Sequence, residues 1–219
     1  MAGAPEWDYR PQEPAPHGAM LGPGRVFVYD LATLDADGDT MPDAWEQRFG
    51  LDPLDPSDAM LDADEDGRTN AEEHAAFSHP ANDPALTRYF AEGAASDTFE
   101  TRLAFVNPGS VAAHLAIRFL TGSGETRGTS LTVPAQASAV VVVNDLPGME
   151  DAEFSTTIES DVAVVADRRM TWPRGIGYGA HVETSLPGPE TTWYLAEGAT
   201  HGGFDLFYLL QNPGVQAAD

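Results

Sequence analysis

The most specific chemistry in this sequence is a twelve-residue loop of alternating oxygen ligands that runs from Asp62 to Glu73. Carboxylates occupy its positions 1, 3 and 5, glycine occupies position 6, and an amide and a glutamate occupy positions 9 and 12. Calcium takes about six to eight oxygen ligands, and alternate residues of a tight loop can direct theirs inward, whereas magnesium keeps more of its waters. We therefore predict a calcium site. Its candidate ligands are Asp62, Asp64, Asp66, the Arg68 carbonyl, Asn70 and Glu73.

The same spacing occurs a second time, 27 residues earlier, beginning at Asp35. The candidate ligands of this first loop are Asp35, Asp37, Asp39, the Met41 carbonyl, Asp43 and Glu46. The loop carries its glycine, Gly38, at position 4 and has Thr40 at position 6. Thr40 must therefore take a backbone conformation that glycine adopts at lower cost, or the loop follows a different path. Extra oxygens, or caps for turns, could come from the aspartates between the loops, which are Asp52, Asp55 and Asp58.

The distribution of negative charge argues against an ordinary acidic surface. The chain of 219 residues has 35 acidic and 11 basic side chains, and its net charge is −24. Residues 30–83 hold 16 of these acids and only two arginines. Two carboxylates about 5 Å apart repel each other by roughly 3 kcal/mol at an effective dielectric constant near ~20. Loops with four or more carboxylates each therefore require a cation, and we predict Ca²⁺ as the cofactor.

Short helices are expected to hold the closing glutamate of each loop. The segments Asp43–Phe49 and Asn70–Phe77 favour helix, and each follows directly on an acidic loop. The closing glutamates fall in the first helical turn, where the helix dipole favours negative charge. Trp45 is expected to anchor this small unit. We place the paired calcium-loop module at residues 30–84.

From about Tyr89 onward the sequence alternates with a period of two, as strands with one buried face do. Clusters of Gly, Pro, Asn and Asp separate the alternating stretches, which lie at 113–120, 131–133, 140–143 and 162–167. Short strands at this spacing indicate an antiparallel, immunoglobulin-like β-sandwich, which we place at residues 85–192. Residues 1–29 are rich in proline and glycine and are interpreted as a linker or terminus, with a short strand at 25–29. The predicted fold class is mainly β, with the small calcium-loop and short-helix module in front.

An internal repeat relates residues 89–109 to residues 194–214 with a constant offset of 105. Tyr-x-Ala-Glu-Gly-Ala opens each copy and Asn-Pro-Gly closes it, and 9 of 23 aligned positions in 194–216 are identical. A period near 105 is the length of one sandwich domain. Residues 193–219 are therefore either the start of a second copy or the closing strands of the first sandwich, and repeat matching alone does not separate these.

The two loops resemble the thrombospondin type 3-like, EF-hand-like calcium repeats of bacterial secreted proteins. The resemblance covers about residues 33–84. It rests on Asp35-Ala-Asp-Gly-Asp-Thr-Met-Pro-Asp-Ala-Trp-Glu, on Gly-Leu-Asp-Pro, and on Asp64-Glu-Asp-Gly-Arg-Thr-Asn-Ala-Glu-Glu. Dockerin modules share the paired loop-and-helix plan but usually close the loop with aspartate, so the chain fits them less well. From Tyr89 the chain resembles an uncharacterised bacterial β-sandwich repeat marked by Tyr-x-Ala-Glu-Gly and Asn-Pro-Gly, which implies a fold and no activity.

No catalytic constellation accompanies these motifs, so we predict that the protein is not an enzyme. The chain has no cysteine, and the motifs His-Glu-x-x-His and Gly-x-Ser-x-Gly are missing from its sequence. For three pairs of residues we favour a structural explanation over a functional one: turns for the glutamates, packing for the tryptophans and ion pairs for the arginines. The pairs are Glu92 and Glu197, Trp172 and Trp193, and Arg168 and Arg169.

The expected function is structural, in an extracellular or cell-surface module of a bacterial protein whose acidic connector calcium orders. Extracellular modules bind calcium with Kd of about 10⁻⁴–10⁻³ M, which suits the millimolar calcium outside cells. The alternative is an accessory module of a secreted hydrolase that binds a surface glycan or docks to a protein.

Other expectations concern partners and location. The negative charge disfavours nucleic acid as a partner, and no apolar run reaches the roughly 18–20 residues of a membrane-spanning helix. No signal peptide is visible. We expect the chain to be a fragment of a longer array, with neighbouring domains as further partners.

Overall fold

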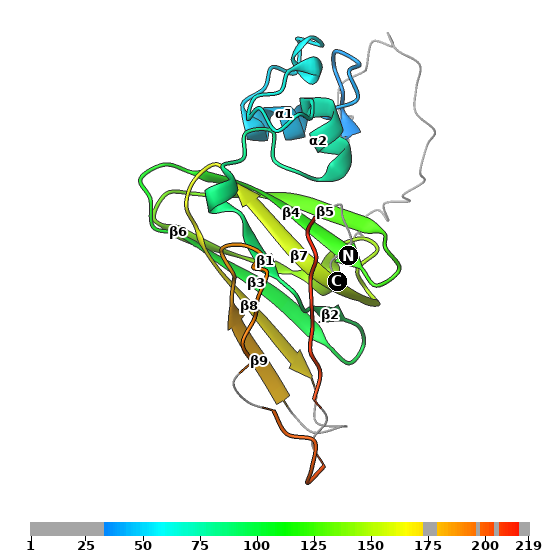
Figure 1. Ribbon diagram of the computed structural model, residues 1–219. Helices are drawn as coiled ribbons and strands as arrows, with labels where there is room; N and C mark the ends of the chain where they lie inside the picture. The colour runs from blue at the N-terminus through cyan, green and yellow to red at the C-terminus, as the bar shows by residue number, and fades with distance from the viewer. Residues whose placement is uncertain (1–32, 173–178, 196–197, 204–205, 215–219) are drawn as a thin grey trace, which may run out of the picture. The chain divides into compact units, whose positions relative to one another are not determined.

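The computed structural model describes residues 33–172, 179–195, 198–203 and 206–214. Within them lie two short α-helices, three short 3₁₀ turns and nine strands (Figure 1). The helices α1 (Asp43–Phe49) and α2 (Asn70–Ala76) confirm the two predicted helices to within one residue. The linker predicted at 1–29, together with its strand at 25–29, lies outside the described residues.

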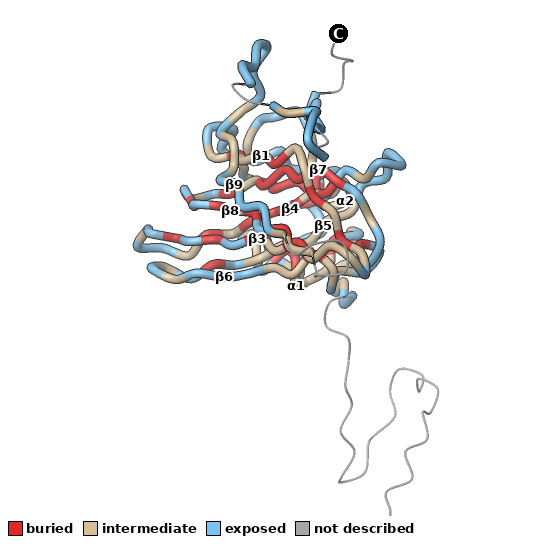
Figure 2. The backbone as a smooth tube through the Cα atoms, turned by 90° about the horizontal axis from the view of Figure 1, so that it is seen from below, coloured by how far each residue is buried: buried red, intermediate tan, exposed pale blue. Residues whose placement is uncertain are grey.

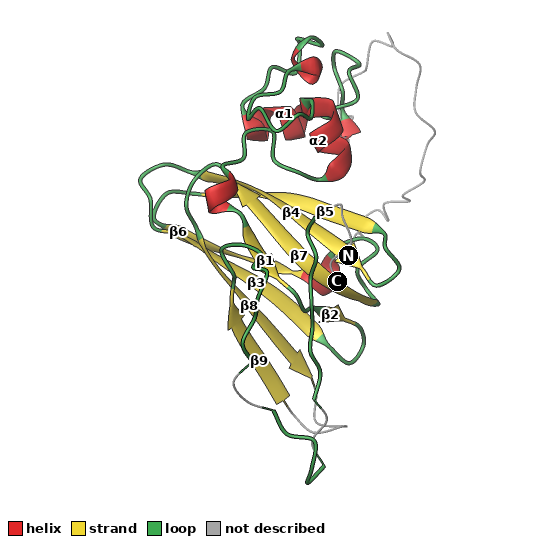
Figure 3. Ribbon diagram, in the orientation of Figure 1, coloured by secondary structure: helices red, strands yellow, loops and turns green. Residues whose placement is uncertain are grey.

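The strands form two antiparallel sheets, which confirms the predicted β-sandwich (Figure 3). One sheet has the order β1-β7-β4-β5, with β2 also paired to β7, and the other has the order β6-β3-β8-β9. Every pairing between these strands is antiparallel. The strands are β1 (Arg88–Phe90), β2 (Ala94–Ala95), β3 (Glu100–Asn107), β4 (Ala113–Thr121), β5 (Thr126–Val133), β6 (Ala137–Val142), β7 (Ala152–Ser160), β8 (Val165–Trp172) and β9 (Gly179–Thr184).

The sandwich core lies between the two sheets, where alternate residues of the strands are buried (Figure 2). In β3, Leu103 and Phe105 are buried, whereas Val106, on the opposite face of the strand, is exposed. Phe119 of β4 meets Phe154 of β7 edge to face, with ring centroids 5.2 Å apart. This alternation is what a strand with one buried face requires. Burial of these apolar side chains supplies the main free energy that holds the sheets together.

One predicted strand begins later than its sequence pattern suggests. The alternation at 162–167 predicts a strand over all six residues, but β8 begins only at Val165. A turn precedes it, in which the Ser160 hydroxyl donates to the Val162 carbonyl (2.7 Å) and accepts the Val162 N–H (3.3 Å). Val164 is nevertheless buried against the sandwich core. The hydrophobic alternation therefore reflects burial of the segment that connects β7 to β8. In that segment, hydrogen bonds of the Ser160 side chain take the place of hydrogen bonds between strands.

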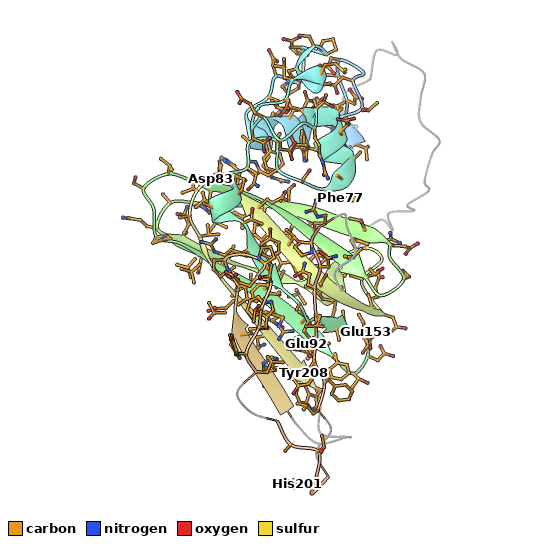
Figure 4. All side chains as sticks on the ribbon, in the orientation of Figure 1. Phe77, Asp83, Glu92, Glu153, His201 and Tyr208 are labelled. Atoms are coloured by element: carbon orange, nitrogen blue, oxygen red, sulfur yellow. The ribbon has the colours of Figure 1, made fainter. Side chains whose placement is uncertain are left out.

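The Ala-Glu-Gly motif of the first repeat copy ties the two sheets together; Figure 4 labels its glutamate, Glu92. The buried guanidinium of Arg168, in β8, donates to the Glu92 carbonyl (2.6 Å) and to the Glu92 carboxylate (2.9 Å). Glu183 of β9 accepts a further bond from it at 3.0 Å. The next residue, Gly93, packs on the ring of Phe154, where a Cβ would lie 2.2 Å from a ring carbon. Arg168 thus forms the ion pairs favoured for it, whereas Glu92, for which a turn was favoured, is one of its partners.

Candidate metal centre

The two acidic loops follow the same backbone path. The N–H at position 6 donates to the carboxylate at position 1 in both, from Thr40 to Asp35 (3.1 Å) and from Gly67 to Asp62 (3.0 Å). The N–H groups at positions 5 and 7 likewise donate to the carboxylates at positions 3 and 5. The N–H at position 9 donates to the carbonyl of the residue before the loop, at 2.7 Å in the first loop and 2.8 Å in the second. The loops are therefore structural equivalents.

Both loops place left-handed backbone at positions 4 and 6. The φ angle is +81° at Gly38 and +83° at Thr40 in the first loop, and +60° at Glu65 and +92° at Gly67 in the second. Each loop therefore has a glycine at one of the two positions and an ordinary residue at the other. Of the two alternatives that the sequence left open, Thr40 takes the unfavourable conformation and the loop keeps its path.

Replacing Thr40 with glycine is expected to tighten cation binding at the first loop. A left-handed β-branched residue costs about 1–2 kcal/mol when the loop is ordered around an ion, and glycine avoids most of this. We expect calcium affinity at the first loop to rise about 3- to 10-fold, measured by isothermal titration calorimetry. The opposite change, Gly67→Thr, adds a Cβ that meets no atom within 4 Å. It should weaken the second site by a similar factor, and unchanged affinities in both variants would contradict the argument.

In the first loop, carboxylates converge in two overlapping groups. Their shared member is Asp39, and the oxygens within each group lie within 4.8 Å of one another. Glu46 joins from the first turn of α1, and Asp58 joins from a 3₁₀ turn (Asp58–Met60) between the loops. The two groups are Asp35, Asp37 and Asp39, and Asp39, Glu46 and Asp58. The sequence offered Asp58 only as one of three possible extra sources of oxygen, and it is the one that the fold brings in.

The other aspartates of this segment are bonded to backbone N–H groups. Asp52 and Asp55 each accept the N–H of the residue two positions further on, both at 3.1 Å, and so cap turns. Asp43, predicted at position 9, accepts the Ala36 N–H through Oδ1 at 2.8 Å. The structure thus places Asp43 on the loop backbone, outside both groups of converging carboxylates.

The second loop has one group of converging carboxylates, and its closing glutamate, Glu73, does not belong to that group. Asn70 and Glu73, on α2, are both buried. Asn70 donates through Nδ2 to the Asp58 carbonyl at 2.8 Å, which leaves its Oδ1 without a partner among the residues that the structure describes. The same is true of Glu73 Oε2. The loop carboxylates with oxygens within 4.8 Å of one another are Asp62, Asp64 and Asp66.

Buried oxygens without hydrogen-bond partners are the strongest sign that these groups hold a cation. Glu46 is 0% exposed, and over the described part of the chain neither of its carboxylate oxygens has a partner. A buried, unpaired carboxylate is costly, and nearly all buried polar atoms in native proteins are satisfied. Oxygen-preferring cations bound in the two loops would supply partners for such oxygens. The other residues of the acidic segment with such oxygens are Asp37, Asp39, Asp58, Asn70 and Glu73.

The lack of a counter-charge also changes the proton affinity of the two closing glutamates. Burial, reinforced by the neighbouring aspartates, raises the pKa of Glu46 to about 7. Burial, reinforced by the aspartates of the second loop, raises the pKa of Glu73 to about 8. A bound cation would stabilise the ionised form of both groups and so reverse these shifts.

Without calcium, the protein is expected to lose stability as the pH rises from about 4.5 to about 8. In this window the folded state keeps protons on Glu46 and Glu73, whereas the unfolded chain has released them. Calcium must displace these protons, so its binding at pH 6 should release about two protons and should tighten as the pH rises. Calorimetry in buffers of different ionisation enthalpy measures the release. Binding without proton release at pH 6 would contradict the raised pKa values.

A small apolar core holds the two loop-and-helix units together. Its buried members are Met41, Trp45 and Ala59, and it is separate from the sandwich core. The Trp45 ring contacts the rings of Phe49 and His74, with centroids 4.9 Å and 5.1 Å away, which agrees with its predicted role as an anchor. Three buried side chains are too few to stabilise a segment of this length by apolar burial alone.

The second loop is linked to the sandwich through the segment that follows α2. The Asn82 N–H donates to Asp64, the carboxylate at position 3, at 3.0 Å. The His79 N–H donates to Glu159 of β7 at 2.9 Å. The segment after α2 therefore contacts a candidate metal ligand on one side and a sheet of the sandwich on the other.

The remaining candidate residues have structural contacts or lie outside the described parts. Trp172 packs against Gly179, where a Cβ would lie 2.0 Å from a ring carbon. Arg169 pairs with Glu100 at 3.5 Å. Glu197 lies outside the described residues.

A β-sandwich of two antiparallel sheets, preceded by a pair of equivalent acidic loops, defines the class of protein. Residues 75–216 match the model of DUF5719, a family of unknown function, and the chain belongs to that family. The match covers the sandwich and begins after the second acidic loop. The thrombospondin type 3-like and EF-hand-like character of the loops therefore stays a prediction.

Comparisons with individual proteins and with solved structures add less than the family match. No curated protein matches the chain. Among solved structures, the chain is similar to Thermotoga maritima 1070, with 18% identity over 47% of this chain and 93% of that one and a TM-score of 0.44. It is also similar to Anabaena sensory rhodopsin transducer, with 28% identity over 38% of this chain and 93% of that one and a TM-score of 0.35. Within the described residues, no helix is long and apolar enough to cross a membrane.

Proposed function

We propose that the acidic loops form a two-site calcium-binding module and that the function of the protein is structural and non-catalytic. The observation that carries this proposal is Glu46, a fully buried glutamate with two unpartnered oxygens in a group of converging carboxylates. Glu73 supports it at the equivalent position of the second loop. Ligand sets made only of oxygen favour calcium over softer metals. Their number favours calcium over magnesium.

In this proposal, calcium orders the acidic segment and holds it on the sandwich. The module has only three buried apolar side chains, so ion binding would supply much of its folding free energy. At a free calcium concentration about 100-fold above Kd, each site adds about 2.7 kcal/mol to the stability of the folded state. Because Asp64 belongs to the second loop and also accepts the Asn82 N–H, filling that loop would fix the connection to β7. An extracellular or cell-surface location provides the calcium required.

Isothermal titration calorimetry of the full chain tests the proposal. We expect two calcium-binding events, of which Asp62→Ala or Glu73→Ala abolishes one and leaves the other. Glu73→Gln keeps the size of the side chain, so that a loss of calcium binding can be distinguished from misfolding. The matched control is Glu65→Ala, because Glu65 lies in the same loop at position 4, where no ligand is expected. Two unaltered events in the Asp62 and Glu73 variants, or no calcium binding by the unmodified chain, would refute the proposed sites.

A further inference from the structure

The segment that repeats the opening of the sandwich exposes an unusual number of large apolar side chains. Soluble domains rarely expose apolar patches of this kind unless the patch binds something. Several of these residues gather around one hollow, lined by Trp193, Leu195 and residues 207–210 together with Tyr89, Ala91 and Leu186 of the first sandwich. The side chains, which are 38–91% exposed and are called the apolar surface below, are Trp193, Tyr194, Leu195, Leu206, Phe207, Tyr208, Leu209 and Leu210.

The repeat shows what normally covers such a surface. Leu195, Tyr208 and Leu210 are 59%, 58% and 81% exposed. Their counterparts 105 residues earlier are core residues of the sandwich that are at most 1% exposed, namely Phe90, Leu103 and Phe105. In the first copy, β1 pairs with β7, and β3 lies between β6 and β8. These three residues share one core with residues of β4, β5 and β7, so later strands of the same sandwich bury this face in the first copy.

The first sandwich does not use the repeated segment to complete its own sheets. Its described residues, 194–195, 198–203 and 206–214, belong to no strand. The Gln211 side chain bonds to the sandwich, donating to the Thr156 carbonyl (3.4 Å) and to the Thr157 hydroxyl (3.2 Å) of β7. That contact leaves the apolar surface exposed.

The segment nevertheless has features of the first copy. The Gly214 N–H donates to Asn212 Oδ1 at 3.0 Å, just as the Gly109 N–H donates to Asn107 Oδ1 at 2.9 Å. The turn that ends β3 in the first copy is thus already present in the second.

We infer that residues 194–214 are the first three strands of a second sandwich of the same fold, in tandem with the first. Leu195, Tyr208 and Leu210 then pack into one core with strands of the β4, β5 and β7 kind from that second sandwich. In a strand with one buried face, alternate residues point to the same side. Leu195, Tyr208 and Leu210 align with buried residues of the first copy and would form the inner face. None of these three residues is charged, as the inner face of a sandwich requires.

The test supplies the missing strands from the chain itself. Residues 1–212 are followed directly by residues 108–190 of the same sequence, so that the join falls within the aligned Asn-Pro-Gly motifs. We expect this protein to show a second cooperative unfolding transition by calorimetry, and the amides of residues 206–210 to become protected from hydrogen exchange. Tyr208→Asp and Leu210→Asp together should abolish the second transition and this protection, and leave the first sandwich unchanged. The control is Leu54→Asp, at an exposed leucine of the acidic segment, which should leave both transitions in place.

Three results would overturn the inference. The added residues could stay unfolded and be digested by protease. They could fold equally well when Tyr208 and Leu210 are replaced. Finally, the unextended chain could form a dimer that Leu210→Asp dissociates, since a second copy of this chain would then be what covers the surface. None of these measurements depends on calcium.

Discussion

The Glu46→Gln variant is expected to be more stable than the unmodified protein in chelator and less stable in calcium. Without an ion, the buried Glu46 carboxylate is repelled by neighbouring aspartates, and its pKa is raised to about 7. At pH 8 the neutral amide removes this repulsion and should raise the free energy of unfolding by about 1–3 kcal/mol. With calcium about 100-fold above Kd, the loss of a ligand should instead lower it by up to about 2.7 kcal/mol.

Urea denaturation at pH 8, with chelator and with calcium, measures both values. The matched control is Asp55→Asn, because Asp55 is exposed and caps a turn outside both groups of carboxylates. That variant should change stability by a similar small amount in the two conditions. If Glu46→Gln also had the same effect with and without calcium, the acidic segment would be a charged structural element with no role for an ion at this site.

The second large effect concerns Arg168, whose removal should destabilise the sandwich by about 3 kcal/mol. Its side chain is 0% exposed and pairs with Glu92 at 2.9 Å and Glu183 at 3.0 Å. Taking away one member of a buried ion-pair group leaves the others unpaired, which is far more costly than losing a surface pair. Because Glu92 and Glu183 are partly solvated, we expect a value near the lower end of the range for such changes.

Urea denaturation of Arg168→Ala in calcium-saturated buffer measures this loss. The neighbouring Arg169 provides the control, since it is 51% exposed and pairs with Glu100 at 3.5 Å. Arg169→Ala should cost less than about 1 kcal/mol. Arg168→Met keeps most of the volume without the bonds. If it were as stable as the unmodified protein, packing at this position, and not the ion pairs, would hold the sheets together.

Local patterns in the sequence predicted the parts of the structure that depend on local physics. Alternation of apolar residues predicted the sandwich, because a strand with one buried face must alternate. An acidic loop followed by a glutamate in a first turn predicted α1 and α2. The equivalence of the loops was harder to see, since Gly38 and Gly67 stand at different positions. Both positions are left-handed in both loops, so a glycine at either one relieves half of the same strain.

Contacts between distant parts of the chain could not be predicted in this way. Asp58 is one of three similar aspartates in the sequence, and only the turn that contains it decides that it reaches Glu46. Phe77 lies against Gly128 of β5, where a Cβ would come within 2.4 Å of its side chain. No sequence pattern within a few residues of Phe77 or of Gly128 indicates that the two residues are in contact. Such contacts depend on how whole helices and strands pack together. The periodicity of a single segment does not reveal that packing.

The hydrogen bond from the Asn70 side chain to the Asp58 carbonyl joins the two loops. It would therefore affect how calcium binds to the two sites. Asp58 contributes its carboxylate to the first group, and Asn70 stands at position 9 of the second loop. An ion held by Asp58 would fix the carbonyl that orients Asn70, and an ion held by Asn70 would fix Asp58 in return. Such coupling is reciprocal. Calcium bound at one loop would then raise the calcium affinity of the other loop, which would still bind calcium alone.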